Sequence, residues 1–203
     1  LTYTSTDLAS ATQTITLAHG AATQVEVDAA STIANAAQLG NVTATIRDQD
    51  GNPVLSETSE VVLSVSGNTT VSLVGASPVN ATNGVATFSG VSILGLEEQK
   101  VLTATVASLS NLSGSANVDL TFGAATQLAL ISGVTEAVNR QAFGADTVIE
   151  ARDSSGNPVD TFSGDVSVSA TTGSGVVTGT LTKTATSSPR VTFSDLEIEG
   201  DVD

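Results

Sequence analysis

Three residues with side-chain oxygens stand at alternate positions in one short segment of the chain. They are Asp48, Asp50 and Asn52. Carboxylate and amide oxygens at this spacing are what a calcium-binding loop supplies. The bidentate glutamate of an EF-hand is missing, because Glu60 stands one position beyond the place it would need. The same segment is also typical of a turn between strands, in which Asp and Asn side chains bind their own backbone. The sequence favours this turn and leaves a Ca²⁺ ion as the alternative.

A second acidic group lies near the end of the sequence, where carboxylates alternate with apolar residues. The carboxylates belong to Asp195, Glu197, Glu199, Asp201 and Asp203, and the residues between them include Leu196, Ile198 and Val202. In a strand, a period of two places the carboxylates on one face and the apolar side chains on the other. This row predicts either a Ca²⁺ site at a junction between modules or a solvated strand face whose charges prevent edge-to-edge aggregation.

The other residues that could do chemistry do not form a catalytic set. His19 is the only histidine, cysteine is absent, and no glycine-rich loop is followed by the helix and lysine that phosphate binding requires. We therefore expect His19 to be a linker residue and the protein to have no enzymatic activity.

The charge of the chain excludes two classes of partner. Its 203 residues include 6 Lys+Arg and 21 Asp+Glu, which gives a formal net charge of −15. Nucleic acids and anionic membrane surfaces attract basic proteins, so we expect neither nucleic-acid binding nor direct membrane insertion. Aromatic residues are only 3% of the chain, which disfavours ligands that are recognised by stacking on rings.

An internal repeat organises the sequence. Three segments recur in the same order at an offset of 103 to 105 residues: 20–24 with 123–127, 47–54 with 152–159, and 84–89 with 189–194. The opening residues 1–4 and 14–17 correspond to 102–105 and 117–120. Self-similarity at a fixed period is the signature of tandem modules.

This alignment predicts one whole module flanked by two complementary pieces. Residues 1–19 correspond to the closing strand pair of a preceding or neighbouring-subunit module, 20–122 to a complete module, and 123–203 to a module without its last strand pair. The pieces add up to a two-module period that is cut at a loop.

Alternating apolar residues between turn signals predict the elements that carry these side chains. Examples are Val42/Ala44/Ile46, Leu102/Ala104/Val106 and Leu128/Leu130. This period suits antiparallel sheets with one buried face, and the Gly-Asn-Pro segments at 51–53 and 156–158 are turn chemistry. We expect an all-β fold of tandem immunoglobulin-like β-sandwich modules of about 100 residues each.

These motifs resemble a family. A strand, Asp-x-x-Gly-Asn-Pro-Val at 48–54, Gly-Val-Ala-Thr-Phe at 84–88 and the closing Leu-Thr-Ala-Thr-Val at 102–106 are similar to the bacterial immunoglobulin-like repeats of invasin and intimin type. The resemblance implies a long extracellular chain, as in adhesin stalks and surface-layer proteins.

The expected function is therefore structural. Modules of a cell-surface filament, stalk or surface layer would stack end to end, with the partner being the same protein, head to tail. In one version the 203 residues are a unit of a longer continuous chain; in the other, the strand pair of one subunit completes the open module of the next. The alternative is an adhesin module that recognises a host protein or glycan.

Overall fold

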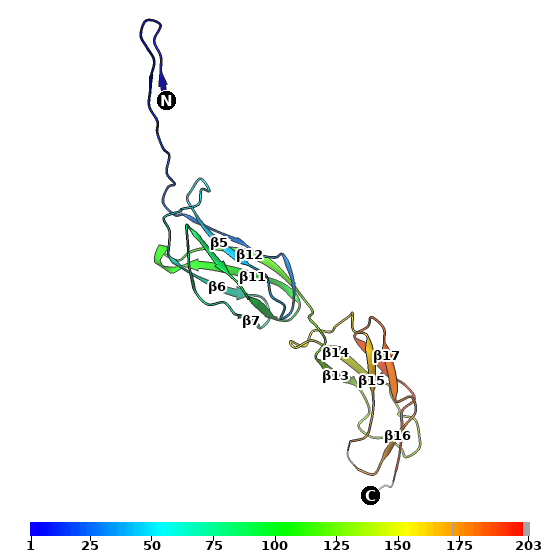
Figure 1. The fold of residues 1–203 in the computed structure, drawn as a ribbon. Helices are drawn as coiled ribbons and strands as arrows, with labels where there is room; N and C mark the ends of the chain where they lie inside the picture. Colours follow the sequence, from blue (N-terminus) through cyan, green and yellow to red (C-terminus); the bar gives the residue numbers. More distant parts are fainter. Residues whose placement is uncertain (172, 201–203) are drawn as a thin grey trace.

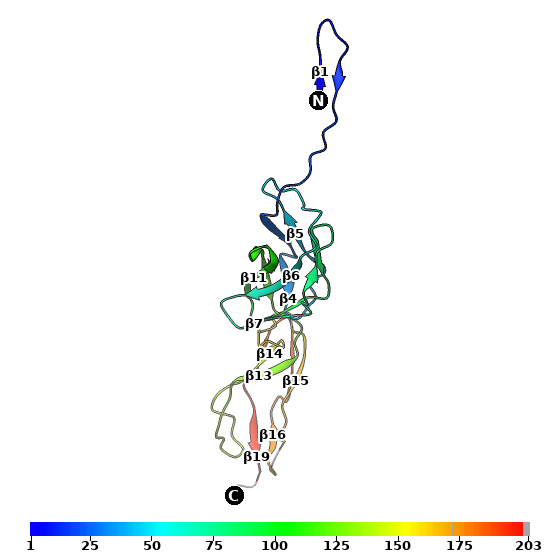
Figure 2. The same ribbon diagram turned by 90° about the vertical axis from the view of Figure 1, so that its left-hand side faces the viewer.

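The chain forms three parts that follow one another along an elongated molecule. The computed structural model describes residues 1–171 and 173–200. A thin N-terminal hairpin leads into a central β-unit, and a second β-unit follows at the opposite end (Figures 1 and 2). In the described residues the regular structure is β-strand, apart from one 3₁₀ turn at Ala107–Leu109. The predicted all-β class is confirmed. No helix of the described part is of the length and apolarity needed to cross a membrane.

The N-terminal hairpin consists of two short antiparallel strands, β1 (Thr2–Tyr3) and β2 (Ala11–Thr12). They pair only with each other among the described strands. Every residue from 1 to 18 is exposed, so the hairpin projects away from the rest of the molecule without a core of its own (Figure 1).

The central unit has two main sheets and a smaller strand pair. One sheet has the order β3-β5-β9, the other has the order β4-β12-β11-β6-β8, and β7 pairs with β10. The strands are β3 (Gln24–Asp28), β4 (Thr32–Ala34), β5 (Val42–Arg47), β6 (Glu60–Ser66), β7 (Val71–Val74), β8 (Val79–Asn80), β9 (Val85–Phe88), β10 (Ser92–Gly95), β11 (Glu98–Val106) and β12 (Leu112–Thr121).

The core of the central unit lies between these sheets. Val42, Ala44 and Ile46 of β5 alternate inward and are fully buried, as are Leu102 and the other inward residues of β11. Residues of both sheets belong to one apolar cluster, so burial of this surface holds the two layers together. Here the alternation read from the sequence predicts the buried face correctly.

The C-terminal unit repeats part of this arrangement. Its sheets are β13-β14-β18, β15-β17 and β16-β19. The strands are β13 (Gln127–Ser132), β14 (Thr147–Arg152), β15 (Gly164–Ser167), β16 (Val176–Thr178), β17 (Thr182–Ala185), β18 (Arg190–Phe193) and β19 (Glu197–Glu199). In chain order they correspond to β3-β5-β9, β6-β8 and β7-β10 of the central unit. Among the described residues this unit has no counterpart of β4, β11 or β12.

The C-terminal core is correspondingly smaller. Its cluster of buried apolar residues holds five side chains, while the central cluster holds eighteen. Leu128 and Leu130, whose alternation predicts a buried face, are 57% and 66% exposed. Their counterparts in β3 are Val25, which is only 8% exposed, and Val27, which is half-buried. The difference arises because β11 and β12 complete the sandwich beside β3, and no described strand does so beside β13.

Candidate functional site

The segment with alternating oxygen ligands forms a tight loop that is centred on one buried carboxylate. Asp48 is 3% exposed, and its Oδ1 accepts hydrogen bonds from the backbone N–H groups of Asp50 (3.1 Å) and Asn52 (2.8 Å). Its Oδ2 accepts from the N–H of Gly20 at 2.8 Å. The side-chain amide of Asn52 also donates to this carboxylate at 3.2 Å. The predicted turn therefore exists. Through the bond to Gly20, it also holds the start of the central unit against the loop.

These donors favour the ionised form of the carboxylate. The backbone hydrogen bond from Gly20, followed by those of the loop, lowers the pKa of Asp48 from its ordinary value of 3.8 to about 2, against the effect of burial. The loop is therefore held together by a carboxylate that stays charged at any physiological pH.

The C-terminal unit contains the same loop with the same hydrogen bonds. Asp153 Oδ1 accepts from the N–H groups of Ser155 (2.9 Å) and Asn157 (3.0 Å), and its Oδ2 accepts from the N–H of Gly123 at 2.9 Å. Burial acts to raise the pKa of Asp153, but the hydrogen bonds from Asn157, Gly123 and Ser155 outweigh it and the pKa is lowered. One short motif thus builds the same structure twice.

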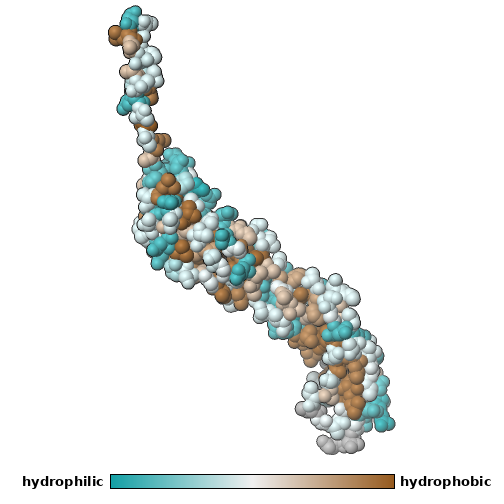
Figure 3. Space-filling model, in the orientation of Figure 1, coloured by the Kyte–Doolittle hydropathy of each residue, from teal (hydrophilic) through white to brown (hydrophobic). Residues whose placement is uncertain are grey.

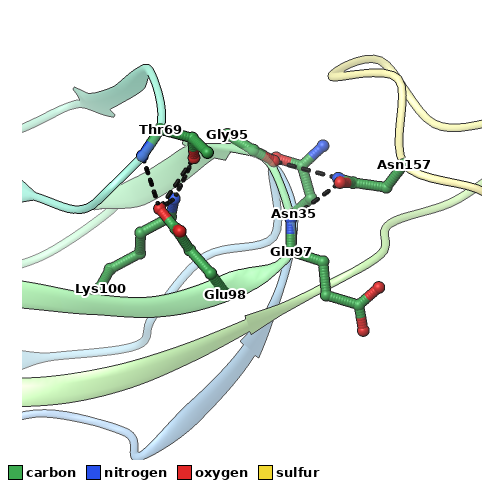
Figure 4. Close-up of polar contacts among 7 residues, drawn as sticks. All are labelled: Asn35, Thr69, Gly95, Glu97, Glu98, Lys100 and Asn157. Atoms are coloured by element: carbon green, nitrogen blue, oxygen red, sulfur yellow. Dashed lines mark hydrogen bonds and ion pairs between the residues drawn. The ribbon is translucent and has the colours of Figure 1, made fainter.

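The second copy of the loop is docked against the end of the central unit. The side chain of Asn157 donates from Nδ2 to the carbonyl oxygen of Gly95 at 3.0 Å and accepts at Oδ1 from the N–H of Glu97 at 2.8 Å. Figure 4 shows this amide reaching from the C-terminal unit to the β10–β11 turn. Asn157 is 3% exposed, so the contact excludes water.

A second asparagine, on the central unit, completes the junction. Asn35 Oδ1 accepts from the N–H of Gly95 (3.0 Å), and its Nδ2 donates to Asp153 Oδ2 (2.9 Å). The hydroxyl of Ser155 donates to Asn35 Oδ1 at 3.1 Å. The buried polar groups at the junction are satisfied across the boundary, so the two units are held in a defined arrangement by directional bonds.

A buried ion pair lies beside this junction. Lys100 is fully buried, and its ammonium pairs with Glu98 and donates to Thr69 Oγ1 at 3.0 Å (Figure 4). Thr69 also donates to Glu98 from its backbone N–H (3.0 Å) and from its hydroxyl (2.8 Å). The side-chain hydrogen bond from Lys100, with those from Thr69, lowers the pKa of Glu98 to about 2. The cluster fixes the start of β11 at Glu98, directly after Glu97, whose N–H belongs to the junction.

The structure describes three of the five predicted acidic residues, Asp195, Glu197 and Glu199. Asp195 Oδ2 accepts from the N–H (3.1 Å) and hydroxyl (2.5 Å) of Thr180, and these bonds lower the pKa of Asp195. Glu197 and Glu199 are half-buried in β19, while Leu196 is buried as the alternation predicts. The predicted ligands Asp201 and Asp203 lie outside the described residues.

Calcium at either acidic segment stays a prediction. Within 1–171 and 173–200, no three His, Cys, Asp or Glu side chains gather closely enough to hold a metal ion. In the loop of Asp48, Asp50 and Asn52, Asp50 contributes its backbone N–H, and the Asp48 oxygens accept this and the other N–H groups around them.

The sequence reasoning did not identify Asn35 or its counterpart Asn139 as functional residues. The signal for them was the repeat itself, because Asn35 and Asn139 stand 104 residues apart, within the offset of the longer matches. Their neighbours Ala36 and Arg140 both have positive φ, 66° and 59°. The two segments are therefore structural counterparts, although their sequences differ around the asparagine.

Comparison with known proteins finds weak structural similarity and no match to a protein family or a curated protein. No protein-family profile matches the chain, and no curated protein matches it. Among solved structures it is similar to domains 5-6 of the S-layer protein SbsC, with 17% identity and a TM-score of 0.34, over 86% of this chain and 84% of that one. Two longer SbsC structures match at 16% identity and a TM-score of 0.34, over 88% of this chain and 22% of theirs. Likeness at this level assigns neither a fold family nor a function.

Proposed function

We propose that the chain is a non-enzymatic structural protein of the cell surface, in which immunoglobulin-like modules are joined end to end in a filament, stalk or surface layer. Its modules are 20–122 and the unit beginning at 123, and residues 1–19 are the closing strand pair of a neighbouring copy's module. The observation that carries the proposal is an exposed apolar strand pair whose counterpart in the central unit is buried.

The N-terminal hairpin has the same register as the strand pair β11–β12. Thr2 pairs with Thr12 and Tyr3 with Ala11, as Thr103 pairs with Ser115 and Ala104 with Gly114. Its apolar side chains occupy positions that are buried in the complete module. Leu1, Tyr3, Ile15 and Leu17 are 68%, 55%, 61% and 94% exposed, while Leu102, Ala104, Val118 and Leu120 are at most 1% exposed. The hairpin therefore corresponds in register and in apolar positions to a closing strand pair, and its apolar side chains are exposed in the described structure.

The C-terminal unit offers the place that such a pair would fill. In the central unit, β11 hydrogen-bonds along β6, and β12 lies next to β11. The counterpart of β6 is β15, which pairs only with β17 and leaves its other edge open among the described strands. Apolar side chains are exposed on the same unit, including Leu128 and Leu130. Figure 3 shows apolar residues both on the hairpin and in a strip along the C-terminal unit.

Adding a neighbour's strand pair to the open edge of β15 would bury the apolar side chains of both the hairpin and the C-terminal unit. Backbone hydrogen bonds give affinity along β15, and the alternate side chains of the incoming pair fill the open core. Burial of each large aliphatic side chain contributes roughly 1.5–3 kcal/mol. The proposal therefore accounts for the exposure of apolar residues on both partners, which a solitary molecule would leave in water.

The adhesin alternative stays an untested prediction and draws less support from the side chains. Phe143 and Phe162, two of the aromatic residues available for a binding patch, pack against the C-terminal core. Tyr3 is exposed, but it belongs to the hairpin.

The test is assembly of the intact chain and its dependence on the hairpin. We expect size-exclusion chromatography with light scattering and electron microscopy to show linear assemblies that denaturing electrophoresis returns to a 20.2 kDa band. The double variant Tyr3→Asp/Ile15→Asp places charges on residues that contact no core, and we expect it to fold normally and stay monomeric. Val62→Asp is the matched control, since Val62 is 40% exposed on β6 of the closed central unit. A wild-type chain that stays monomeric at high concentration, or a double variant that assembles like it, contradicts the proposal.

A further inference from the structure

We propose that the loop of Asp48 to Asn52 is a docking element for a second copy of this chain, and that its receptor is the Asn139–Gly200 end of that copy's C-terminal unit. The inference rests on the proposed end-to-end assembly and assigns the residues of the contact. It starts from a comparison of the two copies of the loop and of the two receptor surfaces.

Both halves of the internal junction occur a second time, and among the described residues neither of these second copies is docked on another unit. The docked loop has buried Asn157, whereas its counterpart Asn52 is exposed. The receptor residues Asn35 and Gly95 are buried under the loop, whereas their counterparts Asn139 and Gly200 are exposed at the far end of the molecule. In the described structure, one loop and one receptor surface are therefore exposed, and they belong to different units of the chain.

The free receptor has the same construction as the occupied one. Asn139 Oδ1 accepts from the N–H of Gly200 at 3.2 Å, as Asn35 Oδ1 accepts from that of Gly95. The N–H of Arg140 donates to the carbonyl oxygen of Ile198 at 2.9 Å, as that of Ala36 donates to Ile93 at 3.0 Å.

The hollows beside the two receptors are lined by corresponding positions. Thr69, Val71, Leu94 and Gly95 line the first, and Ser174, Val176, Glu199 and Gly200 line the second. At the internal junction, Ser155 of the docked loop lines the first hollow as well.

The two receptors differ in the hydrogen bonds of the asparagine amide and of the glycine carbonyl oxygen, which bind the docked loop at one receptor and each other at the second. At the internal junction, the carbonyl oxygen of Gly95 accepts from the incoming Asn157, and Asn35 Nδ2 donates to the incoming Asp153. At the free end, Asn139 Nδ2 donates to the carbonyl oxygen of Gly200 itself, at 3.0 Å. When the loop of a second copy docks, this bond is replaced by two. Asn139 Nδ2 then donates to the incoming Asp48, and the incoming Asn52 donates to the carbonyl oxygen of Gly200.

The residues that differ between the junctions are complementary in charge. The internal junction places neutral Ser155 in the loop and Ala36 beside the receptor asparagine. At the corresponding positions the free loop has Asp50 and the free receptor has Arg140. Both side chains are exposed. Arg140 Nε already pairs with Glu199 Oε2 at 3.4 Å in its own unit, so Asp50 of a docked copy shares or replaces Glu199 as the partner of Arg140. Opposite charges that appear together on the two free halves favour a second copy over an unrelated partner.

The strand exchange leads to the same contact. Within one chain, β12 runs directly into Gly123, whose N–H is bound by the docked Asp153. In the hairpin, β2 ends at Thr12, and the segment after it, in which 14–17 align with 117–120 of β12, leads to Gly20, whose N–H is bound by Asp48. A hairpin that closes the C-terminal unit of a neighbour therefore delivers the Asp48 loop to that neighbour's Asn139–Gly200 end.

Cross-linking tests the contact directly, because the chain has no cysteine of its own. Full-length Asp50→Cys and Ser174→Cys chains are mixed under assembly conditions and treated with a short bis-maleimide. We expect a product of twice 20.2 kDa. An Asn68→Cys chain is the matched control, since Asn68 is exposed at the other end of the central unit, where it lines the hollow beside Gly95; with Ser174→Cys it should give no such product. Assembly without the Asp50–Ser174 product overturns the docking and leaves the proposed function standing, whereas loss of assembly itself overturns both.

Charge reversal gives a second, independent readout. Arg140→Glu should weaken association by about fivefold at low salt, and Asp50→Lys in the same chain should restore it. If the double variant associates no better than Arg140→Glu alone, the Asp50–Arg140 pairing is wrong.

Discussion

Replacing Asn157 by alanine tests how strongly the hydrogen bonds of one side chain hold the internal junction closed. In the wild type, the N–H of Glu97 donates to Asn157 Oδ1 at 2.8 Å, and the carbonyl oxygen of Gly95 accepts from Asn157 Nδ2 at 3.0 Å. Asn157→Ala removes both bonds across the boundary. Net hydrogen bonds of this kind contribute about 1 kcal/mol each, so the junction loses about 2 kcal/mol, which corresponds to opening about 30-fold more often.

Amide hydrogen exchange by NMR measures this opening at the Glu97 N–H. We expect its exchange to be about 30-fold faster in Asn157→Ala than in the wild type, while the amides of β5 keep their protection. The matched control is Asn52→Ala, which removes the same residue from the free loop. Asn52 bonds only within its own loop in the monomer, so the exchange of Glu97 should not change. Equal rates in Asn157→Ala and in the wild type would refute a junction held by this asparagine.

Three further predictions concern charge. Because the pKa of Asp48 is lowered from 3.8 to about 2, its loop contributes stability that is present above pH 3.8 and lost as the pH falls toward 2, and circular dichroism melts across this range should show the loss. The lowered pKa of Asp153 gives its loop a pH dependence of the same sign. Glu98→Gln leaves the buried ammonium of Lys100 without its charged partner, so it should lower the melting temperature more than Lys100→Met does, and the reverse order would contradict the ion-pair account. If the row that starts at Asp195 binds Ca²⁺ at a module junction, chelation should lower the melting temperature of the wild type, and an unchanged transition removes calcium from the account.

The strands and the repeated loop could be predicted because their signals are local. The alternation of Val42, Ala44 and Ile46 needs only a period of two, and the Asp48 turn needs only residues within five positions of one another. Both features depend on neighbours in the sequence, so single-sequence reasoning reaches them.

The junction could not be predicted in the same way because its partners are distant in the sequence. Asn35 bonds to Gly95 and Asp153, which are 60 and 118 residues away. Nothing in the type of one asparagine says that it faces a module boundary. The exposure of Leu128 has a similar origin, because its burial depends on a strand pair that the described part of the C-terminal unit does not contain.

The two free ends are consistent with one assembly rule. In the sequence, connections of equal length lead into the two docking loops, because the aligned segments 117–120 and 14–17 end three residues before Gly123 and Gly20. If the second connection spans two copies, the junction between copies has the geometry of the junction inside one. The assembly would then repeat at every module and not only at every chain. Its copies would differ at the boundary in side chains such as Asp50 and Arg140, so reversing one of those two charges should weaken the junction between copies and leave the internal one intact.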